Sequence, residues 1–118
     1  MCPLTLRAHE RLRHPAEFSR VKTLGRRFRT RHFLVNWREN GLAVHRLGMV
    51  VQKRFWRAVQ RNRIKRCLRE FFRHRKVHIP FPAIDIVVVA LPGAEKLHPQ
   101  DIADEINTVL ARKEGHSL

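Results

Sequence analysis

Residues 53–73 read KRFWRAVQRNRIKRCLREFFR and hold nine Lys or Arg in 21 positions. At about 100° per residue, the apolar side chains of this stretch fall within an arc of roughly 140°. They are Ile64, Cys67, Leu68, Phe71 and Phe72. The pattern predicts an amphipathic helix from about Trp56 to Lys76 whose apolar face packs into a small core.

The opposite side of this predicted helix carries a row of polar groups. Asn62, Arg66, Arg69 and Arg73 recur at spacings of three and four residues, so they share one stripe. Like charges at these spacings repel each other by about a few tenths of a kcal/mol per pair. Only Glu70 interrupts them. A stripe that is unfavourable in the free protein predicts a polyanionic partner.

The whole chain, residues 1–118, predicts a single domain of the α/β class, more closely an α+β sandwich. The expected order is α-β-β-β-α-β-α, with a four-stranded sheet packed against helices. Pro15 opens the first helix, and Phe18, Val21 and Leu24 line its buried face. Gly25 is expected to end that helix in a left-handed conformation.

Alternating apolar residues predict half-buried strands, and a continuous apolar run predicts a central strand covered on both faces. The elements expected after the first helix are a short strand or extended loop at 26–30, strands at 31–38 and 45–52 joined by an Asn40-Gly41 turn, the basic helix, a strand at 84–91, and a last helix from Pro99 that ends before Gly115. The acids Asp101, Asp104 and Glu105 fall near the positive end of that last helix.

Positive charge is concentrated in the first two thirds of the chain. Residues 1–76 hold 22 Lys or Arg and four Glu, whereas residues 77–118 hold three Lys or Arg and six acids. With an overall net charge of +15, this distribution predicts that the first part binds nucleic acid. Residues 1–14 are expected to be a flexible basic arm, and residues 113–118 a tail.

Composition disfavours several classes of protein. The longest apolar run, residues 86–91, is too short to cross a membrane, and the absence of a secretory signal predicts a cytoplasmic protein. Cys2 and Cys67 give no disulfide framework. His74 and His78 have a helical metal-binding spacing, but no Cys or carboxylate nearby completes a site. The sequence therefore predicts no metal ligand, and it offers no acid–base set for catalysis.

The stretch Val51–Glu70, VQKRFWRAVQRNRIKRCLRE, resembles the signature of the bacterial ribonuclease P protein subunit. The matching positions are the basic strand end Lys53-Arg54, the pair Ala58-Val59, and then Arg61-Asn62-Arg63, Lys65-Arg66 and Arg69-Glu70. Other landmarks of the family follow in order between Leu12 and Arg112, namely Leu12, Phe18, a strand with Phe33, a strand at 47–51 and a strand at 85–90.

The resemblance implies a non-catalytic protein subunit of an endoribonuclease. In that family the catalytic RNA subunit removes the 5′ leader of precursor tRNA, using Mg²⁺ held mainly by RNA. The protein binds this RNA and the single-stranded leader, and no obligate protein partner is implied. The resemblance also implies a left-handed crossover between the two strands that flank the basic helix.

The expected RNA contacts combine this signature with the chemistry of guanidinium, ammonium and amide groups. They are Lys53, Arg54, Arg57, Arg61, Asn62, Arg63, Lys65, Arg66 and Arg69. By resemblance, a leader cleft lies between the first helix and the sheet, where Phe18 stacks on bases and Lys22 makes an ionic contact. Core packing is an equal alternative for Phe18. Three positions depart from the family pattern: Lys22 and Asn36 stand where aromatic residues are frequent, and Trp56 where Gly is usual.

Two other functions fit parts of the sequence. A ribosomal or other structural RNA-binding protein with no role in catalysis has the same composition and size. An amphipathic basic helix also suits an anionic membrane surface, although Phe71 and Phe72 are needed for the core of so small a domain.

Overall fold

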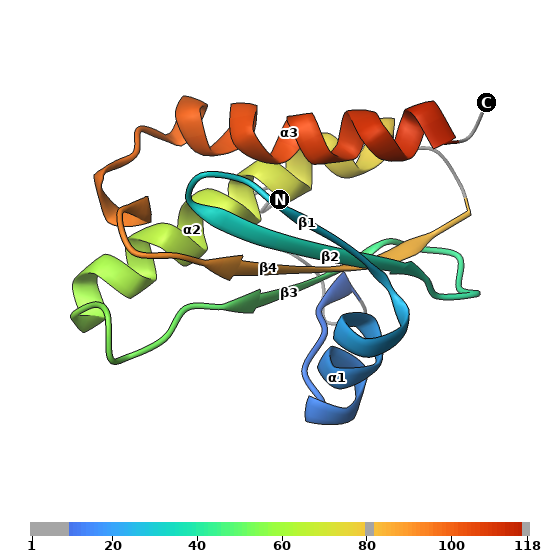
Figure 1. Cartoon of the computed structure of the whole chain (residues 1–118), viewed down its shortest axis with the longest axis horizontal. Helices are drawn as coiled ribbons and strands as arrows, with labels where there is room; N and C mark the ends of the chain where they lie inside the picture. The colour runs from blue at the N-terminus through green and yellow to red at the C-terminus, as the bar shows by residue number, and fades with distance from the viewer. Residues whose placement is uncertain (1–9, 80–81, 117–118) are drawn as a thin grey trace, which may run out of the picture.

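A computed structural model of the chain describes residues 10–79 and 82–116 (Figure 1). Its elements, in chain order, are α1 (Pro15–Leu24), β1 (Arg26–Arg29), β2 (Phe33–Glu39), β3 (Arg46–Val50), α2 (Ala58–Arg75), β4 (Ile84–Ala90) and α3 (Pro99–His116). Two short 3-10 turns, η2 (Lys76–His78) and η3 (Ala94–Lys96), follow α2 and β4. The predicted order and the α+β class are confirmed.

The four strands form one sheet in the order β1-β2-β4-β3. β2 pairs antiparallel with both β1 and β4, and β3 pairs parallel with β4. Every residue of β4 is buried, as the apolar run at 86–90 predicts for a strand covered on both faces. The helix α2 joins the parallel pair, and the left-handed sense of this crossover stays an expectation from the family.

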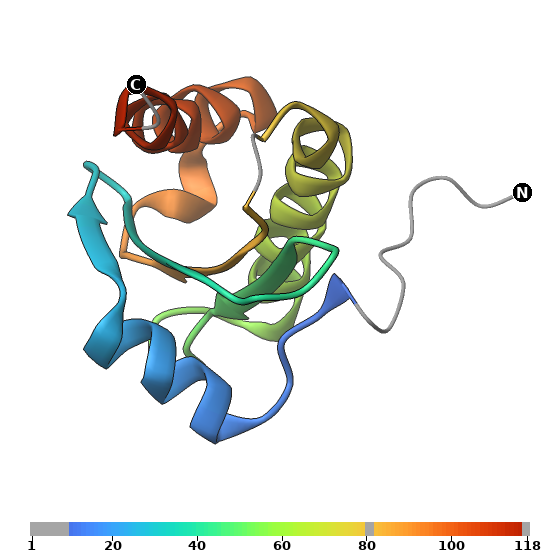
Figure 2. The ribbon, with the colours of Figure 1, turned by 90° about the vertical axis from the view of Figure 1, so that its right-hand side faces the viewer.

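The helices divide between the two faces of the sheet. α2 and α3 lie on one face and α1 lies alone on the other, as both views show (Figure 1, Figure 2). Because side chains alternate along a strand, Ile84, Ile86 and Val88 of β4 pack toward α2 and α3, whereas Val87 and Val89 pack toward α1. The sheet therefore separates a large core from a small one.

The helix α2 starts at Ala58, two residues later than the sequence predicts, and Arg57 is its N-cap residue. The Gln60 side chain accepts a hydrogen bond from the Arg57 N–H at 3.0 Å, which satisfies one backbone donor at the helix start. The apolar stripe forms as predicted: Ile64, Leu68 and Phe72 are buried, and Cys67 and Phe71 are partly buried against the same core.

The end of α1 differs from the prediction. Gly25 has φ −87° and ψ 179°, which is extended rather than left-handed. Glycine is required there by space, since a Cβ would lie 2.5 Å from the Val21 carbonyl oxygen and 2.6 Å from that of Trp37. Leu24 does not join the buried face, because 63% of its surface is exposed.

Residues 10–12 of the predicted basic arm lie against the sheet. Arg11 forms a parallel bridge with Leu47 of β3, and the Leu12 N–H donates to the Leu47 carbonyl at 2.9 Å. Leu12 is buried, and Glu10 forms an ion pair with Lys76. The hydrogen-bonding edge of β3 and one buried leucine thus hold residues 10–12. The predicted arm residues 1–9 lie outside the described residues.

The predicted C-terminal tail is also partly helical. α3 continues to His116, past the predicted end before Gly115. One glycine costs a helix about 1 kcal/mol, which does not have to stop it. Residues 117–118 of the predicted tail lie outside the described residues.

Candidate nucleic-acid interface

The predicted RNA contacts on α2 divide by exposure. Arg57, Asn62 and Arg66 are exposed, whereas Arg61, Arg63, Lys65 and Arg69 are half-buried. Like Arg66, the Lys53 and Arg54 side chains before the helix are exposed. The helix therefore offers an outward row and, beside it, cations that touch the rest of the protein.

Two members of the predicted basic surface turn toward the protein. The Arg63 guanidinium donates to the Leu97 carbonyl oxygen at 2.8 Å, which ties α2 to the segment before α3. Arg73, predicted on the outward stripe, keeps only 16% of its side chain exposed and lies 3.8 Å from a Glu70 carboxylate oxygen. Periodicity alone does not reveal these contacts, because they depend on residues distant in sequence or on rotamers.

Lys65 and Arg69 lie one turn apart and line a hollow of about 190 Å³. We call it the α1–α2 hollow, after the helices that flank it. It is lined by Arg11, Leu12, Arg13, Phe18, Leu47, Met49, Lys65 and Arg69. The hollow therefore brings together the predicted leader residue Phe18 and two of the predicted phosphate contacts, along with two arginines that precede α1.

Phe18 is half-buried and packs against the small core of the α1 face. The tip of its ring lies over Gly48 of β3, where a Cβ would come within 2.7 Å of Cε1 and 2.8 Å of Cζ. Glycine at position 48 is thus what lets the ring approach the sheet. Phe18 packs and lines a cavity at once. Lys22, the other predicted leader residue, is exposed on α1 and does not line this hollow.

The turn before α2 contains an aromatic residue that sequence analysis missed. Phe55 is 39% exposed, and the Arg54 guanidinium carbon lies 4.6 Å from its ring centroid. Arg54 also donates to the Gln52 side chain at 2.9 Å. Val59, the second residue of α2, is 81% exposed. An aromatic residue between basic residues was the available signal.

Trp56, which departs from the family pattern, is buried and covers the start of α2. Its indole N–H donates to a Glu95 carboxylate oxygen at 2.7 Å, and the Gly93 N–H donates to the same oxygen at 3.0 Å. The bond from Trp56 is the main cause that holds the pKa of Glu95 below its ordinary value. Trp56 therefore joins α2 to the η3 turn.

A polar network holds α1 to the sheet. Arg46 of β3 donates to both oxygens of Asp85, at 2.8 and 2.7 Å, and lies 2.9 Å from Glu17 of α1. Asn40 also donates to Asp85, at 2.9 Å. The hydrogen bond to Asp85 is the main cause that raises the pKa of the Arg46 guanidinium, against the opposing effect of burial. Arg46 therefore has a structural role.

The chain matches the family model described as Ribonuclease P over residues 6–114. It is 56% identical over 109 residues to the ribonuclease P protein component of Syntrophobacter fumaroxidans, with 92% of each chain covered. It belongs to the ribonuclease P protein family. A solved structure of the Staphylococcus aureus RNase P protein is similar to it with a TM-score of 0.78 and 35% identity, covering 88% of this chain and 94% of that one.

A second relative, the ribonuclease P protein component of Syntrophus aciditrophicus, is 37% identical over 113 residues and covers 96% of this chain. Membership in the ribonuclease P family gives the chain a role in tRNA 5′ processing, as the protein component of a ribonucleoprotein endoribonuclease. The resemblance seen in Val51–Glu70 is thereby confirmed for nearly the whole chain.

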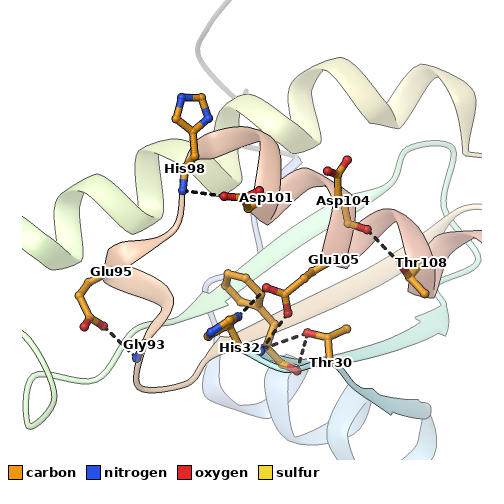
Figure 3. Close-up of polar contacts among 10 residues, drawn as sticks. Thr30, His32, Gly93, Glu95, His98, Asp101, Asp104, Glu105 and Thr108 are labelled. Carbon is orange, nitrogen blue, oxygen red and sulfur yellow. Dashed lines mark hydrogen bonds and ion pairs between the residues drawn. The ribbon is translucent and has the colours of Figure 1, made fainter.

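The acids of α3 in this ribonuclease P family member are engaged separately (Figure 3). Asp101 accepts from the His98 N–H at 3.3 Å, and Asp104 accepts from the Gln100 side chain at 3.0 Å. Glu105 is half-buried, with a carboxylate oxygen 2.7 Å from the His32 ring nitrogen, and it accepts a hydrogen bond from the His32 N–H at 2.9 Å. Each of these three acids therefore forms hydrogen bonds that stabilise the fold.

Burial alone would raise the pKa of Glu105, but its hydrogen bonds from His32 outweigh burial and hold the pKa below the ordinary value. Contrary to the sequence analysis, a carboxylate does lie beside His74, since Glu70 is 3.7 Å away. Even so, residues 10–79 and 82–116 contain no group of three His, Cys, Asp or Glu side chains that could hold a metal ion.

Within the part of the chain that the structure describes, no helix has the length and apolar character needed to span a membrane.

Proposed function

We propose that this chain binds the catalytic RNA of ribonuclease P through α2 and the single-stranded 5′ leader of precursor tRNA at the α1–α2 hollow. In doing so it assists endonucleolytic removal of the leader, which gives the mature tRNA 5′ end. The observation that carries the proposal is the hollow itself. An aromatic ring, Phe18, and two cations of the signature helix, Lys65 and Arg69, line one cavity.

The chemistry of the hollow suits an unpaired nucleotide. A ring that packs with its tip over Gly48 offers its remaining surface to a base, and base–aromatic stacking contributes about 1–3 kcal/mol per base. Lys65 and Arg69 supply cations for the adjoining phosphates. Because stacking tolerates any base, we expect weak dependence on leader sequence.

The exposed row on α2 suits the phosphates of a folded RNA. Arg66 and Arg57 are exposed, and Asn62 between them offers an amide to a ribose 2′-OH or a base edge. Lys53, Arg54 and Arg61 extend the row toward the start of the helix, while Arg63 contributes through its bond to Leu97. Of the nine predicted RNA contacts, Arg63 is therefore proposed to hold α2 in place, and the others are proposed to touch RNA.

The reaction itself is proposed to belong to the RNA. The RNA holds the Mg²⁺ ions, and the protein contributes positive charge that offsets repulsion between catalytic RNA and substrate. Fixing these phosphates in place lowers the Mg²⁺ concentration needed for cleavage. We also propose that the protein works in the cytoplasm without an obligate protein partner and without contact with a membrane.

The test is cleavage of precursor tRNA by a bacterial ribonuclease P RNA over a series of Mg²⁺ concentrations, with and without this protein. The midpoint of the Mg²⁺ titration should shift to lower Mg²⁺ with the protein. The Lys96→Gln variant should behave like the unchanged chain, because Lys96 is exposed on η3, does not line the hollow and is not among the proposed RNA contacts. Binding to the RNA without any shift would favour the structural RNA-binding alternative. Cleavage by RNA-free protein would overturn the assignment of catalysis to RNA.

A further inference from the structure

A second basic region lies outside α2 and takes no part in the function proposed above. Residues 18–38 contain no Asp or Glu, and their cations are Arg20, Lys22, Arg26, Arg27, Arg29, Arg31 and Arg38. Four of these fall within six residues on β1 and the turn that follows it. Arg26, Arg27, Arg29 and Arg31, here called the β1 edge, are all exposed.

The β1 edge and α2 lie on opposite sides of the molecule. β1 is one edge strand of the sheet and β3 is the other, and α2 packs beside β3. In Figure 2, β1 lies at the left and α2 at the right. Because the sheet stands between them, one short RNA segment does not reach both surfaces without wrapping around the protein.

The structure holds two of these arginines in place. The Arg27 Nε donates to the Asn36 side-chain oxygen at 3.3 Å, and Asn36 is its cross-strand partner. Asn36 is fully buried, so it is a fixed support. The Arg26 guanidinium carbon lies 5.7 Å from the ring centroid of the buried Trp37. A cation that is held in advance loses less freedom when it binds an anion.

The pattern suits a polymer better than a single anion. Alternation along the strand puts Arg27 and Arg29 on one side of β1, about 6.6 Å apart along the chain, and Arg26 on the other. Arg31 continues the row beyond the strand. Among the described residues, Arg29 and Arg31 form no ion pair with a carboxylate. An extended row of exposed guanidinium groups matches the repeated phosphates of a nucleic-acid backbone.

We propose that the β1 edge binds the phosphate backbone of a second RNA segment, distinct from the one on α2 and read without base specificity. This rests on the proposed function in that α2 is taken to hold the catalytic RNA. The protein then joins two RNA segments of the ribonucleoprotein, one at the β1 edge and one on α2. Charged side chains on an edge strand also prevent strand-to-strand association, and the experiment separates the two roles.

The decisive variant is Arg29→Gln/Arg31→Gln, because neither side chain forms a hydrogen bond, ion pair or ring contact with the described residues. Its matched control is Lys96→Gln/Ala111→Glu, which also lowers the net charge by two at exposed positions. The Arg66→Gln variant serves as the α2 reference. Each full-length protein is bound to a bacterial ribonuclease P RNA, alone and with precursor tRNA, over a salt series, and the complexes are footprinted with hydroxyl radicals.

The β1 variant should reduce the slope of log K against log salt by roughly 0.7–0.9 per lost phosphate contact, beyond any change in the charge control. It should also lose protection at nucleotides that the Arg66→Gln complex still protects. A slope and footprint equal to those of the charge control would overturn the proposal, and new aggregation with unchanged RNA binding would assign the arginines to edge protection. Loss of the same nucleotides as Arg66→Gln would mean one surface rather than two. If the unchanged protein does not bind the RNA, the proposed function fails instead.

Discussion

The two faces of the sheet are built in different ways. Among the residues that the structure describes, eighteen buried apolar residues form one continuous core toward α2 and α3, whereas the core toward α1 consists of Leu12, Val21, Val87 and Val89. On the α1 face, the network of Arg46 with Asp85 and Glu17 supplies much of the attachment. The face toward α2 and α3 stabilises the fold, and the face toward α1 leaves room for a ligand beside Phe18. The same protein thus separates stability from binding across one sheet.

The largest expected effect on stability comes from the face covered by α2 and α3. It is tested by comparing Phe72 of this face with Phe18 of the α1 face. Phe72→Ala removes a side chain that is 1% exposed among α2, α3 and the sheet, so it should lower the free energy of unfolding by about 3–5 kcal/mol. Urea unfolding followed by circular dichroism measures this. Phe18→Ala, from the half-buried ring on the α1 face, should cost clearly less. Equal losses would show that the two faces stabilise the fold equally.

The next effect tests the polar attachment of α1. Asp85→Asn removes the carboxylate that receives two hydrogen bonds from Arg46, in a site where 11% of the Asp85 side chain is exposed. Because Arg46 keeps Glu17 as a partner, we expect a loss of about 2–3 kcal/mol rather than the full cost of an unpaired buried charge. Thermal melts measure it. If Asp85→Asn melts like the unchanged protein, the ion pair between Arg46 and Glu17 of α1 is sufficient to stabilise the Arg46 guanidinium.

Phe18→Ala should reveal the binding role of the α1 face. If the ring stacks on the leader, substrates with a 5′ leader should bind about 1–3 kcal/mol more weakly per stacked base, and mature tRNA should be unaffected. Binding assays with precursor tRNAs of increasing leader length distinguish leader stacking by Phe18 from core packing. Gly48→Ala is the companion variant, since its Cβ displaces the ring tip without removing the ring. Parallel loss for leadered and leaderless tRNA would return Phe18 to a packing role only.

A smaller effect concerns pH and the polar contact on the core face. The pKa of Glu105 is held below its ordinary value of 4.5, so the native state binds fewer protons there than the unfolded chain. Its contribution, about 1 kcal/mol after allowance for solvent, is present above that value and is lost as the pH falls through the lowered pKa. Melts of the unchanged chain and Glu105→Gln should differ at pH 6 and converge in acid. A constant difference would assign the effect to packing.

The smallest effect on stability belongs to the exposed row of α2. Arg66→Ala should change the free energy of unfolding by less than about 0.5 kcal/mol while lowering the salt slope of RNA binding by roughly 0.7–0.9. Arg69→Ala, in the hollow, should lower the slope similarly. Arg63→Ala is the control, because it loses the bond to Leu97 and should destabilise the protein by about 1 kcal/mol. If Arg66→Ala destabilised the protein more than Arg63→Ala, Arg66 would be the structural residue and Arg63 the RNA contact.

Sequence alone predicts most of the fold, because periodicity reports burial. The alternation in β2 and the continuous apolar run of β4 both identify strands, and the stripe through Ile64 and Leu68 identifies the buried face of α2. Contacts between distant segments are not periodic. The bond from Arg63 to Leu97 and the docking of residues 10–12 on β3 therefore escaped prediction. The exposed ring of Phe55 was missed although its basic neighbours were a local signal.

Of the residues that line the α1–α2 hollow, the sequence predicts Phe18, Lys65 and Arg69 as RNA or leader contacts, but not that they lie together. The signature around Arg61-Asn62-Arg63 identified the basic helix through family resemblance, yet only the folded chain brings Lys65 and Arg69 beside Phe18 and Arg13. Gly25 ends α1 as predicted, but the predicted left-handed conformation is wrong for a related reason. This glycine serves close packing against the Trp37 carbonyl, a contact that depends on where β2 lies.

The position of β4 has a consequence for how the chain folds as it is made. This strand is last in sequence but lies between β2 and β3, with Phe33 facing Ala90 and Arg46 facing Asp85. Such distant pairings form late, since long loops must close first. Until β4 leaves the ribosome, the apolar stripe of α2 has no completed sheet to cover. The basic surface of α2 therefore takes its final shape only when the acidic last third of the chain has been synthesised.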